Sequence, residues 1–117
     1  VEHHPYLDQT KVHDACQAAG LAMVSFCPLA RGGDLFDEPA IREAAGRHGR
    51  TPAQIVLRWQ VQKPGVVAIP RTRKVERLAE NLAVGDFRLD DAEMAAIDAL
   101  GRRKLRLCNF AFSPEWD

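Results

Sequence analysis

The stretch VVAIPRTRKVER, residues 66–77, decides the fold class. It opens with four consecutive apolar residues, a pattern typical of a strand that is buried on both faces of a parallel sheet. A helix is predicted to begin directly afterwards, at about residue 72. Its apolar side chains fall at i, i+3, i+4 and i+7 and are Val75, Leu78, Ala79 and Leu82. A buried strand that leads into an amphipathic helix predicts an α/β fold.

The segment upstream repeats this alternation of strand and helix. Residues 2–6 resemble the tail of a strand, residues 9–19 a helix stopped by Gly20, and residues 21–26 an apolar strand. A strand, a helix and a strand in this order indicate a parallel crossover. Two strands and a remnant do not make a well-covered sheet, so the pattern predicts further strands outside this sequence. We therefore interpret the chain as a piece of a longer protein.

Capping patterns predict the boundaries of the other helices. Thr51 stands at a predicted N-cap, with Pro52 at the first helical position and Gln54 at the third. Asp90 and Glu93 form a second capping box before the last helix. The remaining predicted segments are a loop over 30–38, a helix over 39–48 that ends at Gly49, and an irregular tail over 101–117.

The bulk composition excludes several function classes. The 117 residues carry 16 basic and 16 acidic side chains, so the net charge gives no reason to expect a nucleic-acid partner. The sequence has no run of about 18 apolar residues, which argues against a membrane span. Three widely spaced cysteines do not form a disulfide framework and suit a reducing cytoplasm. The four histidines lack the spacing of metal ligands, so no metal site is expected.

The basic cluster that follows the second strand is the first candidate site. It contains Arg71, Arg73, Lys74 and Arg77, close to the predicted start of a helix. Because the unpaired N–H groups of a helix N-terminus already carry partial positive charge, cations there destabilise the helix unless an anion is bound. Phosphate is the natural anion, and Thr72 adds a hydroxyl donor. The alternative is a solvated basic face without a ligand.

Several motifs make the chain resemble the aldo-keto reductases in order and spacing. They are EHHPY at 2–6, SFCPLA at 25–30, TPAQI at 51–55, IPRT at 69–72, RLAENL at 77–82 and DFRL at 86–89. They cover nearly the whole chain. The tail FSPEWD at 112–117 is similar to that of bacterial 2,5-diketogluconate reductases.

The resemblance implies a fold and an activity. The family is a (β/α)8 TIM barrel, and residues 1–117 resemble its C-terminal portion, from the end of strand 6 through strand 8 to a terminal helix and a substrate-loop tail over 101–117. It implies NADP(H) as cofactor and a small carbonyl compound as substrate. The catalytic tyrosine, lysine, aspartate and histidine of the family lie upstream, and Tyr6 does not match that tyrosine. The chain alone is therefore expected to be inactive, and to need the remaining barrel strands or self-association to cover its strand edges.

The resemblance also assigns cofactor-binding residues. They are Phe26, Cys27, Leu29, Arg31, Gly32, Arg71, Thr72, Arg73, Arg77, Glu80 and Asn81. Phe26 matches the aromatic residue that stacks on the nicotinamide ring. Arg71 and Thr72 match the pair that binds the adenosine 2′-phosphate, and Glu80 and Asn81 match residues that bind the adenine amino edge.

The other assigned residues complete the site. Leu29, Arg31 and Gly32 match the loop that covers the pyrophosphate, and Arg77 matches a residue at the adenine or the phosphate. Cys27 stands where a small residue such as serine is common, and no nucleophilic role is expected for it.

Each assignment has a structural alternative. Phe26 is also interpretable as a core residue at a strand end, Arg31 as a loop charge, and Glu80 with Asn81 as the end of a helix. Trp59 and the apolar stripe that includes Val75 are interpreted as core. The aromatic residues of the tail are candidates for a substrate pocket or for simple anchors: Phe110, Phe112 and Trp116. The alternative for the whole chain is a noncatalytic half-barrel with a structural or assembly role.

Overall fold

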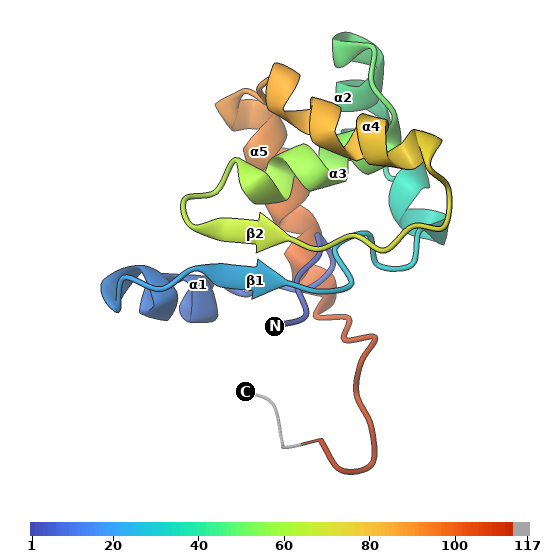
Figure 1. Ribbon diagram of the computed structural model, residues 1–117. Helices are drawn as coiled ribbons and strands as arrows, with labels where there is room; N and C mark the ends of the chain where they lie inside the picture. The colour runs from blue at the N-terminus through green and yellow to red at the C-terminus, as the bar shows by residue number, and fades with distance from the viewer. Residues whose placement is uncertain (114–117) are drawn as a thin grey trace.

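A computed structural model describes residues 1–113 and shows a small parallel sheet covered by helices on one face (Figure 1). Strand β1 (Met23–Ser25) pairs in parallel with β2 (Val66–Ala68), with Val24 opposite Val67. Glu2 forms a parallel bridge with Phe26, which confirms a strand remnant at the start of the chain. The predicted parallel strand order is thus confirmed, although both strands are shorter than expected.

The helices follow the predicted order. Those of α type are α1 (Thr10–Ala18), α2 (Pro39–His48), α3 (Pro52–Val61), α4 (Glu76–Leu82) and α5 (Asp91–Asp98). Those of 3-10 type are η1 (Gly33–Asp37), η2 (Ala83–Asp86) and η3 (Ala99–Arg103). The segment expected to be a loop over 30–38 therefore contains η1, and η3 occupies the start of the tail that was expected to be irregular. None of the described helices is long and apolar enough to cross a membrane.

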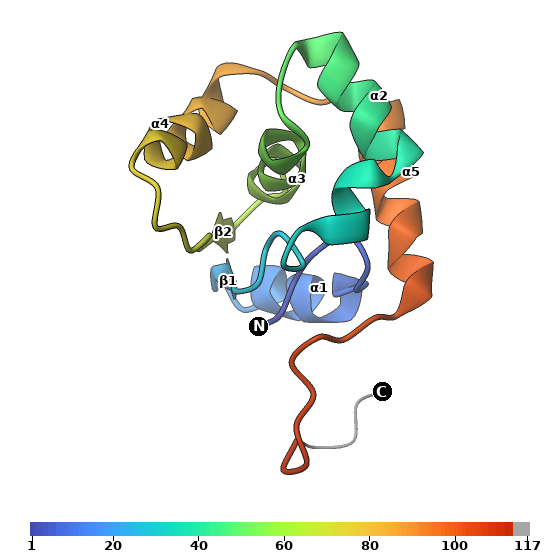
Figure 2. The ribbon, with the colours of Figure 1, turned by 90° about the vertical axis from the view of Figure 1, so that its right-hand side faces the viewer.

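Helix α3 lies at the centre of the helical layer. Figure 2 shows α4 on one side of it and α2 with α5 on the other. Its side chains Ile55, Val56 and Trp59 are almost fully buried and join one core cluster with Ile41 from α2 and Ile97 from α5. The interpretation of Trp59 as core is confirmed. This central helix also underlies the candidate site, as shown below.

Local capping groups account for the confirmed boundaries. The Gln54 amide donates to Thr51 Oγ1 at 3.2 Å, and the Thr51 amide donates to the Gln54 side chain at 3.0 Å. Asp90 and Glu93 make the same reciprocal pair at 2.7 and 2.8 Å. Gly49 ends α2 with a left-handed φ of 60°, a conformation that glycine adopts without a steric penalty. Both predicted capping boxes are thus confirmed.

Two predictions about apolar faces are wrong within the described part of the chain. Strand β2 is not buried on both faces, because Val67 is 47% exposed. Helix α4 begins at Glu76, later than expected, and its apolar stripe is open to solvent, with Val75 78% and Leu82 82% exposed. Both faces are exposed for the same reason, which is that no described residue covers them.

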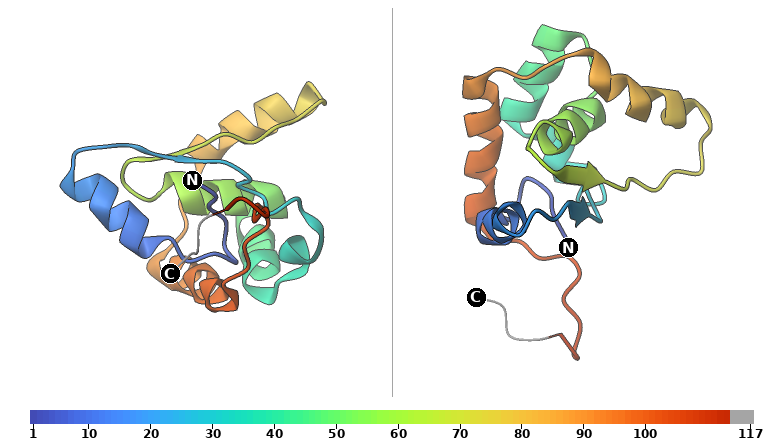
Figure 3. Two further views of the ribbon diagram at one scale, coloured as in Figure 1. Left: turned by 90° about the horizontal axis from the view of Figure 1, so that it is seen from below. Right: turned by 60° about the vertical axis from the view of Figure 1, so that its left-hand side comes forward.

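The tail after η3 extends away from the helices, past the strands (Figures 1 and 3). Its first residues are held by the start of the chain, since Leu105 donates its amide to the Tyr6 carbonyl at 2.9 Å. Phe110 and Phe112 stack on each other at 5.4 Å and are exposed. Trp116, a candidate pocket residue, lies outside the described residues.

Candidate functional site

A cleft of about 500 Å³ opens at the carboxyl ends of the two strands. Its walls are the loop after β1, the loop after β2, the N-terminus of α3 and one face of α4. In parallel α/β sheets, ligands bind at this end of the strands, because the connecting loops there are free to vary. The cleft is therefore the natural candidate for a site.

Most residues that the sequence suggested for cofactor binding meet in this cleft. Those that line it are Cys27, Leu29, Arg31, Gly32, Arg71, Thr72, Arg77, Glu80 and Asn81. Phe26 and Arg73 do not line it. The sequence did not suggest the other lining residues, which are Pro28, Phe36, Thr51, Pro52, Ala53 and Pro70. Pro28 and Pro70 adjoin suggested residues, and Thr51, Pro52 and Ala53 belong to the predicted start of a helix, so for these five the position in the sequence was the available signal.

The loop after β1 has an unusual backbone. Cys27, Ala30 and Arg31 have positive φ angles of 53°, 47° and 63°, and Gly32 follows at 78°. Left-handed conformations are uncommon for residues with a Cβ and cost about 1 kcal/mol each. A Cβ on Gly32 would lie 3.1 Å from the Phe36 ring, so a larger residue would also have to displace that ring. Strain of this kind concentrates at ligand-binding loops.

The basic residues after β2 stand earlier relative to the start of α4 than the sequence predicted. Arg71, Thr72, Arg73 and Lys74 precede α4, and only Arg77 of the four cations lies in its first turn, beside Glu76. The Thr72 hydroxyl accepts the Lys74 amide at 3.1 Å and shapes the turn before the helix. The cations therefore lie around the start of the helix but mostly in the loop before it, and Arg71 and Arg77 line the cleft.

Three guanidinium groups line the cleft, from Arg31, Arg71 and Arg77. Among residues 1–113, the structure shows no ion pair to any of them. The salt bridges of the described chain involve other arginines, such as Arg47 with Glu93. Positive charge from three separate segments therefore converges on one cavity.

Two glutamines of α3 hold the cleft walls in place; the sequence indicated Gln54 only as part of a capping box and did not indicate Gln60. The Gln54 side chain donates to the Glu80 carbonyl at 3.0 Å and so fixes α4. Gln60 is fully buried; it donates to the Pro28 carbonyl at 2.7 Å and accepts the Ser25 hydroxyl at 2.6 Å. Because a buried amide must be hydrogen-bonded, these bonds fix α4 and the loop after β1 relative to α3.

The one tyrosine of the chain lies outside the cleft. The Tyr6 hydroxyl donates to the Glu38 carboxylate at 2.6 Å. Burial, and then this hydrogen bond, raises the pKa of Tyr6 to about 12. Tyr6 therefore stays protonated and bound to Glu38 at neutral pH.

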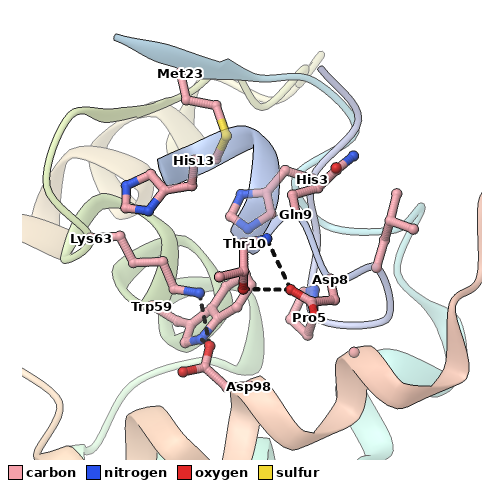
Figure 4. Close-up of a pocket in the computed structure, with 12 residues that line it drawn as sticks. His3, Pro5, Asp8, Gln9, Thr10, His13, Met23, Trp59, Lys63 and Asp98 are labelled. Carbon is pink, nitrogen blue, oxygen red and sulfur yellow. Dashed lines mark hydrogen bonds and ion pairs between the residues drawn. The ribbon is translucent and has the colours of Figure 1, made fainter. Parts of the chain in front are cut away.

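A second pocket of about 200 Å³ lies between α1, α3 and the end of α5 (Figure 4). Lys63 reaches across the Trp59 ring, 3.9 Å from its centroid, to Asp98 at 2.8 Å. Burial, and then the Lys63 cation, lowers the pKa of His3 to about 3, so His3 is neutral. None of the suggested cofactor residues lines this pocket. Within residues 1–113, no group of three or more potential ligands is arranged to hold a metal ion.

Comparison with known sequences gives a consistent result. A model of the aldo/keto reductase family matches residues 1–102. Methylglyoxal reductase DkgA of Salmonella typhimurium is 43% identical over 105 residues, which cover 89% of this chain and 38% of that protein. The NADH-dependent D-xylose reductase of Candida parapsilosis is 37% identical over 130 aligned positions, which cover 100% of this chain and 38% of that protein. The chain thus spans less than half the length of these relatives.

Solved structures agree with the sequence matches. The crystal structure of a putative 2,5-diketo-D-gluconic acid reductase B superposes with a TM-score of 0.92 at 43% identity, covering 100% of this chain and 42% of that one. A mutant of Gox0644 in complex with NADPH superposes with a TM-score of 0.85 at 35% identity, covering 93% of this chain and 40% of that one. The family match and these identities show that the chain belongs to the aldo/keto reductase family.

Proposed function

We propose that this chain binds the phosphate and adenine end of NADP(H) in an NADPH-dependent reductase of aldehydes and ketones. The observation that carries the proposal is the cleft, in which nine suggested residues from separate segments come together. Three unpaired guanidinium groups and a hydroxyl fit a ligand with several phosphates. Relatives described as NAD(P)H-dependent and as bound to NADPH support a nicotinamide cofactor.

Each wall of the cleft has a role in this proposal. Arg71 and Thr72 bind the 2′-phosphate through a cation and a hydroxyl, as the basic loop after β2 permits. Arg31, on the left-handed loop after β1, binds the pyrophosphate. Glu80 and Asn81 hydrogen-bond the adenine edge from α4. When bound, the cofactor supplies the hydride for carbonyl reduction.

Phe26 has a separate role in the proposal. It lies at the end of β1, is 40% exposed and does not line the cleft. An exposed ring at a strand end is free to stack on the nicotinamide, so we place the reactive end of the cofactor beyond the cleft, at Phe26. In this proposal residues 1–117 form the C-terminal portion of a TIM barrel. The other strands of the barrel lie on the exposed side of β1 and β2.

Cofactor preference tests the proposal. Fluorescence titration of the chain should give a dissociation constant for NADPH about 10- to 100-fold lower than for NADH, because a charged hydrogen bond contributes about 1.5–3 kcal/mol. Arg71→Ala should abolish this difference. Arg73→Ala is the matched control, since it removes an equal charge two residues away and outside the cleft. Equal affinities for both cofactors, unchanged in the Arg71 variant, would contradict the proposal.

A second candidate function is a noncatalytic half-barrel, and the position of Tyr6 favours it for the 117 residues alone. The hydroxyl of the one tyrosine is bound to Glu38 and lies outside the cleft, so it is not placed to protonate a carbonyl there. We expect no consumption of NADPH when the chain is mixed with methylglyoxal, a small dicarbonyl named for a relative. Turnover above the protein-free rate, followed by absorbance at 340 nm, would show that the chain contains a complete catalytic set.

A further inference from the structure

Two cysteines that are far apart in the sequence lie together at the edge of the cleft. Cys27 is the second residue after β1 and lines the cleft, while Cys108 belongs to the tail. Glu2 brings them together: it bridges to Phe26 beside Cys27, and its Oε2 accepts the Cys108 amide at 3.0 Å. The Cys27 side chain is among the groups that raise the pKa of Cys108, as expected for two neighbouring thiols. Both are free and partly exposed.

From this juxtaposition we infer that Cys27 and Cys108 form a reversible disulfide when the protein meets a peroxide. The bond ties the tail to the edge of the cleft. Cys16 is excluded from the pair, because it stands on α1, away from the cleft. Both cysteines lie in segments without a helix or strand, so closing an S–S bond of about 2.05 Å does not break any element of the fold.

The oxidation balances with one hydrogen peroxide. The Cys27 thiolate attacks the peroxide, an S–O bond forms as the O–O bond breaks, and a sulfenic acid and water result. The Cys108 sulfur then attacks the Cys27 sulfur, the S–S bond forms as the S–O bond breaks, and the hydroxyl takes up the proton of the Cys108 thiol and leaves as a second water. Two thiols and one peroxide thus give one disulfide and two waters, and a dithiol reductant reverses the step.

The surroundings give the two thiols different parts in this reaction. Burial, and then the negative charge of Glu2, raises the pKa of Cys108, so this thiol remains protonated and reacts slowly with peroxide. Cys27 lines the open cleft and meets the peroxide first. Cys108 is the thiol that resolves the sulfenic acid.

The link affects the cleft directly. Arg31 acts on Cys108 electrostatically and also lines the cleft, so the tail lies beside the segment proposed to bind pyrophosphate. Fixing the tail there should hinder entry of the cofactor, and bound cofactor should hinder formation of the link. This consequence rests on the proposed function, whereas the disulfide itself does not.

Peptide mapping tests the link. The folded chain is treated with one equivalent of hydrogen peroxide, blocked with an alkylating agent and digested with trypsin. We expect the loss of two of the three thiols per chain, and a disulfide between the peptides 12–31 and 107–117. The first peptide contains both Cys16 and Cys27, so the map alone does not identify the partner of Cys108.

Single variants complete the test. Cys16→Ser must retain the link, and Cys108→Ser must lose it and accumulate sulfenic or sulfinic acid at Cys27. A link that survives only with Cys16, or thiol loss without any link, would overturn the inference.

A further arm adds saturating NADPH, which should slow formation of the link at least tenfold. If NADPH binds without slowing it, the link does not lie at the cleft; if NADPH fails to bind while the link still forms, only the cofactor proposal fails.

Discussion

The Glu2 carboxylate is buried near the start of the chain and binds the start of the tail. Its Oε1 accepts the Leu107 amide at 2.6 Å and lies 2.9 Å from His4 Nε2, and its Oε2 accepts the Cys108 amide. Burial raises the pKa of Glu2, but the hydrogen bonds from Leu107, His4 and Cys108 together outweigh it and place the pKa below 4.5. The ionised form is therefore the one that the folded chain stabilises.

Replacing Glu2 tests this arrangement. Glu2→Gln should lower the free energy of unfolding at pH 7 by about 2 kcal/mol, because it removes charge-assisted hydrogen bonds to backbone amides. A folded-state pKa below the unfolded value of 4.5 means that this stability is present above pH 4.5 and is lost as the pH falls through the folded pKa. The gap between the variant and the parent chain should therefore narrow below pH 4.5 in urea unfolding.

The control for this experiment is Asp14→Asn, which neutralises an exposed carboxylate on α1. It should leave unfolding at pH 7 within about 0.5 kcal/mol of the parent chain. A constant gap for the Glu2 variant from pH 7 to pH 3 would show that the ionised carboxylate does not stabilise the fold.

Individual site residues differ in how far the sequence identified them. The place of Arg71 and Thr72 in the cleft was predictable, since both follow an apolar strand at the end where parallel sheets bind ligands. Glu2 and Gln60 were not. The partners of Glu2 lie at the other end of the chain, and those of Gln60 lie in a distant strand and loop. Such contacts depend on tertiary structure, which leaves no local pattern in the sequence.

At the scale of helices and strands, local capping decided which boundaries were predictable. Helices α3 and α5 begin where expected because a side chain at the N-cap binds the third helical amide in each. Helix α4 begins later than expected because its N-cap, Val75, offers no side-chain hydrogen bond. Its apolar stripe correctly indicated a helix, but periodicity alone does not fix the first residue.

The α5 cap provides a quantitative test of this argument. Asp90→Ala removes the acceptor of the Glu93 amide and should lower the free energy of unfolding by about 1 kcal/mol. Asp91→Ala is the matched control, since Asp91 is an exposed acid one residue later that makes no capping bond. Thermal or urea unfolding by circular dichroism measures both. Equal losses in the two variants would attribute the effect to the helix dipole instead of the cap.

At the scale of the whole molecule, the chain covers only one side of its sheet. Met23 and Ser25 of β1 face the helices and are buried, whereas Val24 faces away and is 46% exposed. Val67 stands opposite Val24 in the parallel register and is exposed on the same face. The sequence predicted that further strands were needed, because two strands and a remnant are too few to bury such residues. It did not show which face would be left open, because consecutive apolar residues look alike from both sides.

This open face predicts that the isolated chain associates with itself. An apolar sheet face with an unpaired strand edge is a common cause of association between protein chains. Sedimentation velocity should give an average mass that rises with concentration above the monomer mass of 13.0 kDa. The double substitution Val24→Thr with Val67→Thr keeps β-branched side chains but makes the face polar, and should return the mass to that of the monomer. Leu105→Thr changes an exposed apolar residue of the tail and should have little effect. A parent chain that stays monomeric at every concentration would show that the exposed face of the sheet is not an interface. Association that persists in the double variant would place the interface elsewhere, for example on the apolar stripe of α4.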